Sequence, residues 1–175
     1  MKIALYSLVH DSDTLDIVSR IIAFFSEKDT LVQVEKELLT HFTSTTAKAF
    51  ESHHDIDAAT DVFFAVGGDG TVLRALKYVR ESGIPVIGIN TGRLGFLATV
   101  QPDEVASTLQ DIINKNYTTE ARSVLEIKTE PPHQELETFP LALNEISIAR
   151  ENTTSMITIH TQIDDAYLNV YWADG

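Results

Sequence analysis

The stretch VFFAVGGDGTVLRAL, residues 62–76, decides the fold of this chain. Its first five residues, Val62 to Val66, are apolar and include aromatic and β-branched side chains, a composition typical of a strand buried on both faces of a parallel sheet. A glycine turn and then a helical pattern follow. Because such strands end at the edge where α/β proteins bind ligands, the stretch predicts a ligand site at residues 67–71.

The turn combines phosphate-binding features with one acid. Gly67, Gly68 and Gly70 let the backbone approach a ligand, Thr71 is expected to open the next helix, and N–H groups in such turns suit phosphate. The carboxylate of Asp69 would repel a phosphate unless Mg²⁺ or a hydroxyl proton lies between them. We therefore expect Asp69 to accept a hydroxyl proton during phosphoryl transfer. The alternative is a tight turn in which aspartate merely favours the conformation.

Three further segments narrow this interpretation. The loop NTGRLGFL, residues 90–97, follows an apolar strand pattern at 86–90, the pair Asn144-Glu145 lies in ALNEISIAR, and Ala173-Asp174-Gly175 closes the chain. In this order, GGDGT, NTGRLGFL, NE and the acidic dipeptide resemble the motifs of the NAD kinase family. That family transfers the terminal phosphate of ATP to the 2′-hydroxyl of the adenosine ribose of NAD.

The resemblance implies roles for the turn. Asp69 would accept the proton of the ribose hydroxyl, and Arg74, one turn into the helix, would lie near the dinucleotide phosphates. ATP would bring Mg²⁺, with no metal-binding side chain assigned. The residues expected to hold the phosphates of ATP are Gly67, Gly68, Gly70 and Thr71.

The resemblance also implies an acceptor site. Phe96 and Leu97 would line the NAD pocket, Asn144 and Asp174 would bind the adenine, and Glu145 would bind a ribose. The full set expected to contact NAD is Asp69, Gly70, Arg74, Phe96, Leu97, Asn144, Glu145 and Asp174.

Structural alternatives remain open for several of these residues. Arg74 could be a solvated helix residue, and Phe96 and Leu97 could belong to the core. A regular strand would place Asn144 and Glu145 on opposite faces, so both reach one ligand only at a bulge or at the end of the strand.

Composition limits the classes of partner. The 175 residues contain 26 Asp and Glu against 13 Lys and Arg, a net charge of -13, which argues against nucleic acid and anionic membranes as partners. A phosphate ligand would need shielding by backbone N–H groups, Arg74, Arg93 or Mg²⁺. Cysteine is absent, which excludes disulfides and thiolate chemistry and fits a cytoplasmic location. The neighbours His53 and His54 favour a solvated loop over a metal site.

The hydrophobic pattern predicts an α/β fold with a doubly wound nucleotide-binding domain, residues 1–117, followed by consecutive antiparallel strands. The resemblance implies that these strands begin an all-β sandwich domain, residues 118–175. The first domain should contain an irregular connection at 40–60, and its first helix a cap at Asp13 or Thr14. Expected strands cover residues 2–9, 31–39, 62–66, 86–90, 123–129, 141–149, 156–162 and 166–172, and expected helices cover 15–25, 71–82 and 103–113.

The sequence thus predicts an ATP-dependent NAD kinase, with NAD and ATP as substrates. Family chains are longer, so we expect this chain to stop within the second domain. We also expect the complete protein to form a homo-oligomer, a dimer or tetramer. Two alternatives stay open. One is a non-catalytic nucleotide-binding fragment, and the other is a lipid or sugar kinase that shares the GGDG turn.

Overall fold

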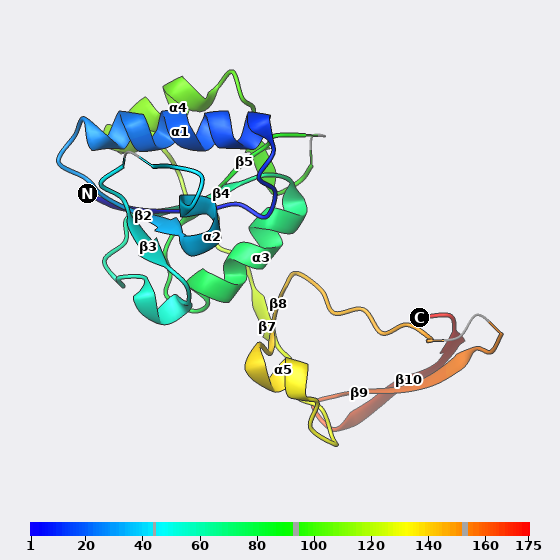
Figure 1. The fold of residues 1–175 in the computed structure, drawn as a ribbon. Helices are drawn as coiled ribbons and strands as arrows, with labels where there is room; N and C mark the ends of the chain where they lie inside the picture. The colour runs from blue at the N-terminus through cyan, green and yellow to red at the C-terminus, as the bar shows by residue number, and fades with distance from the viewer. Residues whose placement is uncertain (44, 93–94, 152–153) are drawn as a thin grey trace. The chain divides into compact units, whose positions relative to one another are not determined.

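The computed structural model describes residues 1–43, 45–92, 95–151 and 154–175, which form two compact units, Met1–Leu143 and Asn144–Gly175. Helices and strands alternate through most of the first unit (Figure 1). Its elements are β1 (Lys2–Tyr6), α1 (Ser12–Ser26), β2 (Leu31–Glu35), α2 (Lys36–Leu39), β3 (Lys48–Phe50), a 3₁₀ turn (His53–Asp55), β4 (Val62–Val66), α3 (Asp69–Val79), β5 (Val86–Ile89), β6 (Ala98–Val100), α4 (Val105–Ile113), β7 (Val124–Glu126), α5 (Gln134–Thr138) and β8 (Leu141–Leu143).

A six-stranded parallel sheet forms the centre of the first unit, in the order β3-β2-β1-β4-β5-β6. From β1 the chain builds outward to β3 and then returns to place β4 on the other side of β1. The strand order therefore reverses between β1 and β4, and ligands of such sheets bind outside the carboxyl ends at this point. The predicted doubly wound fold is confirmed.

Helices cover both faces of the sheet, α1 and α4 on one face and α3 on the other (Figure 1). Strand β4 alternates between the two cores: Phe64 packs with the α1 side, and Phe63 packs with the α3 side. Every residue of β4 is buried. This double burial explains why the strand before the glycine turn has no polar side chain.

The structure corrects the predicted start of α1 and the segment after β2. Asp11, not Asp13 or Thr14, caps α1, because its Oδ1 accepts a hydrogen bond from Thr14 N at 2.9 Å. The predicted strand at 31–39 ends at Glu35, whose carboxylate accepts from Leu38 N at 3.0 Å and opens the short helix α2.

The expected irregular connection at 40–60 is also wrong in part. Strand β3 lies within it, beside β2, and anchors the sheet edge through Phe50, which is 1% exposed. Helix α3 begins at Asp69 after an N-cap at Gly68, so Thr71 does not open it. Strand β6 and helix α5 were not predicted, because both are only three to five residues long.

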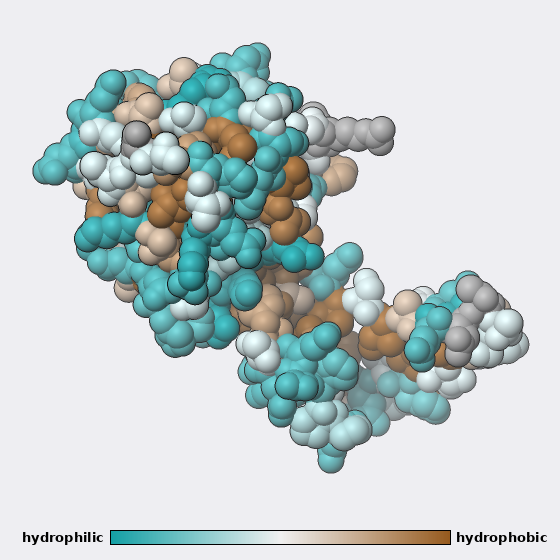
Figure 2. All heavy atoms as spheres, viewed as in Figure 1, coloured by the Kyte–Doolittle hydropathy of each residue, from teal (hydrophilic) through white to brown (hydrophobic). Residues whose placement is uncertain are grey.

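The second unit contains an antiparallel pair, β9 (Ile157–Ile163) and β10 (Ala166–Ala173), as the sequence predicts. Large hydrophobic side chains of β10 are exposed, among them Trp172 at 74%. Hydrophilic residues cover most of the visible face of the first unit (Figure 2). The two units differ in bounds from the expected domains, 1–117 and 118–175, which stay a prediction, as does the sandwich.

Across the described residues, none of the helices combines the length and apolar character that crossing a membrane demands.

Candidate functional site

The glycine turn continues β4 at the carboxyl edge of the sheet. Gly67 N donates to the carbonyl of Ile89 in the neighbouring strand at 2.8 Å, and Gly67 has a φ of 149°. A Cβ at this position would overlap the side chain of Thr71. Thr71 itself is buried, and its N–H donates to the carbonyl of Gly68 at 2.9 Å. The fold therefore requires glycine at position 67, and the Thr71 side chain packs beneath the turn.

The other two glycines of the turn face open space. A Cβ added at Gly68 or at Gly70 would meet no atom of the described residues within 4 Å. Glycine in a helix costs about 1 kcal/mol relative to alanine, and Gly70 lies in the first turn of α3. None of the described side chains caps this helix start, so the first-turn N–H groups other than that of Thr71 can bind an anion. The described part of the fold therefore does not require glycine at these two positions, and the space beside them is open to a ligand.

Asp69 is held by the backbone of the second glycine-rich loop. Its Oδ2 accepts a hydrogen bond from Phe96 N at 2.8 Å, and its Oδ1 accepts from Leu97 N at 2.9 Å and from Ala98 N at 3.0 Å. These bonds, led by the one from Ala98, lower the pKa of the Asp69 carboxyl. Asp69 is therefore ionised at neutral pH.

The loop itself presents two predicted contact residues beside Asp69. Phe96 is 92% exposed and so does not belong to the core, and Leu97 is partly buried. Before the loop, the carboxamide oxygen of Asn90 accepts from Gly92 N at 2.7 Å. The predicted phosphate-shielding residue Arg93 lies outside the described residues.

A cavity of about 550 Å³ opens where β1 and β2 end, beside helix α3. Its lining includes Arg74, the cation predicted to bind phosphate, and the rings of Tyr6 and Tyr78, whose centroids are 5.0 Å apart. Burial raises the pKa of Tyr6, and it raises the pKa of Tyr78 to about 12, so both phenols stay neutral. The other lining residues are Ser7, Leu8, His10, Glu35, Lys36, Glu37, Thr40, Glu51 and Lys77.

The sequence did not single out Tyr6, His10 or Lys77 as site residues. The cavity wall comes from four separate segments: the end of β1, the end of β2 with α2, the residue after β3, and α3. No local spacing links them. Only the parallel topology, which brings the carboxyl ends together, could have pointed to them.

Asn144, Glu145 and Asp174 belong to the second unit. Asn144 has a φ of 70° and follows the end of β8. The backbone is thus not a regular strand at the NE pair, and the face alternation expected for one does not apply. The guanidinium of Arg150, which the sequence did not single out, contacts both carboxylate oxygens of Asp174 at 3.0 and 3.1 Å.

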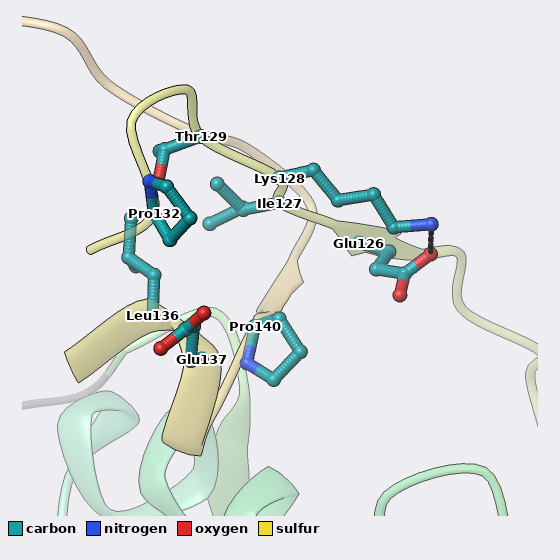
Figure 3. Close-up of a pocket in the computed structure, with 8 residues that line it drawn as sticks. All are labelled: Glu126, Ile127, Lys128, Thr129, Pro132, Leu136, Glu137 and Pro140. Atoms are coloured by element: carbon teal, nitrogen blue, oxygen red, sulfur yellow. Dashed lines mark ion pairs between the residues drawn. The ribbon is translucent and has the colours of Figure 1, made fainter. Parts of the chain in front are cut away.

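A second hollow, of about 380 Å³, lies between β7 and α5 in the first unit. Figure 3 shows Ile127, Leu136 and Pro140 around it, and an ion pair between Lys128 and Glu126 at its edge, 3.3 Å long. None of the predicted site residues lines this hollow.

Among the described residues, no group of three or more His, Asp or Glu side chains could hold a metal ion. The single acid of the turn, Asp69, already accepts three N–H bonds. Mg²⁺ bound to nucleotide phosphates needs no such group, because phosphate oxygens and water supply most of its ligands.

Comparison with known families gives a match to the ATP-NAD kinase N-terminal domain over residues 12–117. The chain is 39% identical to the NAD kinase of Christiangramia forsetii and 42% identical to that of Flavobacterium psychrophilum, over its full length in both cases. It spans 61% of the length of each of these curated relatives. The NAD kinase of Bacteroides fragilis is 48% identical over 66% of this chain and 39% of its own.

Among solved structures, the fold is similar to yeast NADH kinase complexed with NADH, with a TM-score of 0.74 and 20% sequence identity. The similarity covers 99% of this chain and 55% of the yeast chain.

Proposed function

Because this chain belongs to the NAD kinase family, we propose that the protein transfers the terminal phosphate of ATP to the 2′-hydroxyl of the adenosine ribose of NAD. The observation that carries the proposal is the glycine turn. Gly68 and Gly70 leave open space at a helix start, and Asp69, which lies between them in the sequence, carries an ionised carboxylate bonded to the neighbouring loop. A phosphate and a hydroxyl can therefore meet at one place.

On the donor side, first-turn N–H groups of α3 would hold ATP phosphates beside Gly68 and Gly70. Arg74, in the same helix, lines the cavity and would add a cation near the phosphates of the acceptor, NAD. Thr71 would support the turn rather than hold phosphate, because its side chain is buried beneath Gly67 and its N–H bonds to the carbonyl of Gly68. Mg²⁺ bound to ATP would neutralise phosphate charge.

On the acceptor side, NAD would contact Phe96 and Leu97, with its ribose hydroxyl against Asp69. A carboxylate has about four acceptor positions, and backbone N–H groups occupy three at Asp69, which leaves one for the hydroxyl. The hydroxyl oxygen bonds to the terminal phosphorus as the bond to the bridging oxygen breaks and ADP leaves. The hydroxyl proton then passes to Asp69.

The lowered pKa of Asp69 bears on the timing of that proton transfer. A weakly basic carboxylate accepts a proton only once the hydroxyl has become strongly acidic, which happens as its oxygen bonds to phosphorus. Asp69 therefore orients the hydroxyl early in the reaction and takes its proton late.

In the second unit, Asn144 and Asp174 would bind the adenine of NAD, and Glu145 a ribose. Asp174 would use lone pairs that Arg150 leaves available. We further propose a cytoplasmic location, and a dimer or tetramer as the complete protein.

The test is an acceptor panel. The chain is mixed with ATP and MgCl₂ and with NAD, a diacylglycerol or a sugar, and phosphorylated products are identified by mass spectrometry. NADP formed from NAD supports the proposal, and a phosphorylated lipid or sugar in its place would assign the chain to a different kinase class. NAD binding without any product would favour a nucleotide-binding module.

A further inference from the structure

The carboxylate of Asp69 joins two segments that are far apart in the sequence. Its three hydrogen bonds reach residues 27, 28 and 29 positions away, and all three donors are backbone N–H groups. Both carboxylate oxygens take part. We call residues 95–98 the anchored loop, because its last three residues are tied to the first turn of α3.

Gly95 shows how closely the loop approaches this carboxylate. A Cβ added at Gly95 would overlap the Asp69 carboxylate. By contrast, a Cβ added at Gly92 would meet no atom of the described residues within 4 Å. The missing side chain at position 95 therefore makes room for the Asp69 carboxylate.

Phe96 shows what the anchor holds in place. Its side chain is 92% exposed, although its N–H is bound to Asp69 at 2.8 Å. A large apolar ring in water gains little from its own packing, so its position depends on the backbone beneath it. Asp69 fixes that backbone.

We propose that Asp69 is also a positioning residue, whose carboxylate holds the anchored loop in the shape that presents Phe96 and Leu97 to the acceptor. The anchor follows from the contacts alone, and its link to the acceptor rests on the proposed function. One side chain thus touches the reacting hydroxyl and shapes the surface that receives the rest of NAD.

Asp69→Asn is consequently not a pure loss of the base. The amide oxygen of asparagine can still accept from Leu97 and Ala98, but its NH₂ group would face the N–H of Phe96. Two donors then oppose each other, and the loop loses its bond at the exposed aromatic residue. If Asp69 served only as the base, the substitution Asp69→Asn would leave the loop unchanged.

The first experiment measures amide hydrogen exchange by NMR in the unliganded chain. Asp69→Asn should speed exchange at Phe96 by about tenfold, with smaller increases at Leu97 and Ala98. The control Asp16→Asn removes an exposed carboxylate on α1 and should leave all three amides unchanged. Unchanged exchange at residues 96–98 in Asp69→Asn would overturn the anchor, whether or not the chain is a kinase.

The second experiment separates positioning from proton transfer. Gly95→Ala keeps the Asp69 carboxylate, but the added methyl group occupies the space where this carboxylate lies against the loop. The variant should therefore bind NAD about tenfold more weakly and retain ATP binding. The matched variant Gly92→Ala should bind both nucleotides as the original chain does. If Gly95→Ala binds NAD normally, the anchored loop does not shape the acceptor surface. If the original chain binds no NAD at all, the proposed function fails. The hydrogen-exchange result still shows whether Asp69 holds the anchored loop.

Discussion

The glycine turn, Gly67–Gly70, and the anchored loop, residues 95–98, use the same residue type in opposite ways. Gly68 and Gly70 in the turn border open space, whereas Gly95 in the loop borders the carboxylate of Asp69. Asp69 belongs to the turn and bonds to the loop. Glycine therefore leaves open space in the turn, where we propose that the nucleotide approaches, and makes room for another part of the chain in the loop.

The largest effect on stability is expected from adding a side chain at Gly95, where the Asp69 carboxylate already occupies the space. Gly95→Ala should lower the free energy of unfolding by about 1–3 kcal/mol, the usual cost of forcing extra volume into occupied space. Gly92→Ala should stay within about 0.5 kcal/mol, because its Cβ meets open space and its N–H still bonds to Asn90. Urea unfolding measures both, and equal effects would remove the distinction between open and closed glycines.

Adding a side chain at Gly70, which borders open space, should change the free energy of unfolding in the opposite direction. Gly70→Ala should raise the free energy of unfolding by about 0.5–1 kcal/mol, because alanine favours the helix and restricts the unfolded chain. The same variant should weaken ATP binding, measured by calorimetry, since the added methyl group occupies the space that the nucleotide needs. A loss of stability would mean that the fold itself requires this glycine.

Acid should weaken the link between the two regions. The pKa of Asp69 is lowered by its bonds from Ala98, Phe96 and Leu97, so the folded state favours the ionised carboxylate. Its contribution to stability is complete above the unfolded pKa of about 3.9 and is lost as the pH falls through the lower folded value. The difference in unfolding free energy between the original chain and Asp69→Asn should therefore shrink below about pH 4. A difference independent of pH would contradict the anchor.

The smallest effect on stability is expected at the exposed ring. Phe96→Ala should change the free energy of unfolding by less than about 0.5 kcal/mol, because the side chain is 92% exposed. NAD binding should weaken while ATP binding remains. A marked loss of stability in thermal unfolding would place Phe96 in the core after all.

The regular part of this site was predictable from the sequence. The apolar run Val62–Val66 and the glycines after it have local signals, and the strand and turn lie where the pattern indicates, although helix α3 begins two residues before the predicted start at 71. The anchor has no local signal, because the partners of Asp69 are backbone groups nearly thirty residues away. Strand β3 escaped prediction because only Phe50 in it is buried.

The lining of the cavity beside α3 could likewise not be predicted in full from local sequence patterns. The family resemblance pointed to Arg74, but Tyr6 and His10 come from the end of another strand and follow none of the quoted motifs. Their meeting depends on the order of the strands in the sheet, which local patterns do not encode.

The most direct test of the account is the rate at which this chain forms NADP from NAD, ATP and Mg²⁺, with Asp69→Asn and Asp16→Asn beside it. The account predicts NADP formation by the original chain and by Asp16→Asn. It predicts a loss of about 10²–10⁴-fold or more in Asp69→Asn, because removing a general base usually costs this much and the anchored loop is disturbed as well. NADP formation at an equal rate by all three chains would contradict the role of Asp69. Failure of the original chain to form NADP would contradict the proposed activity.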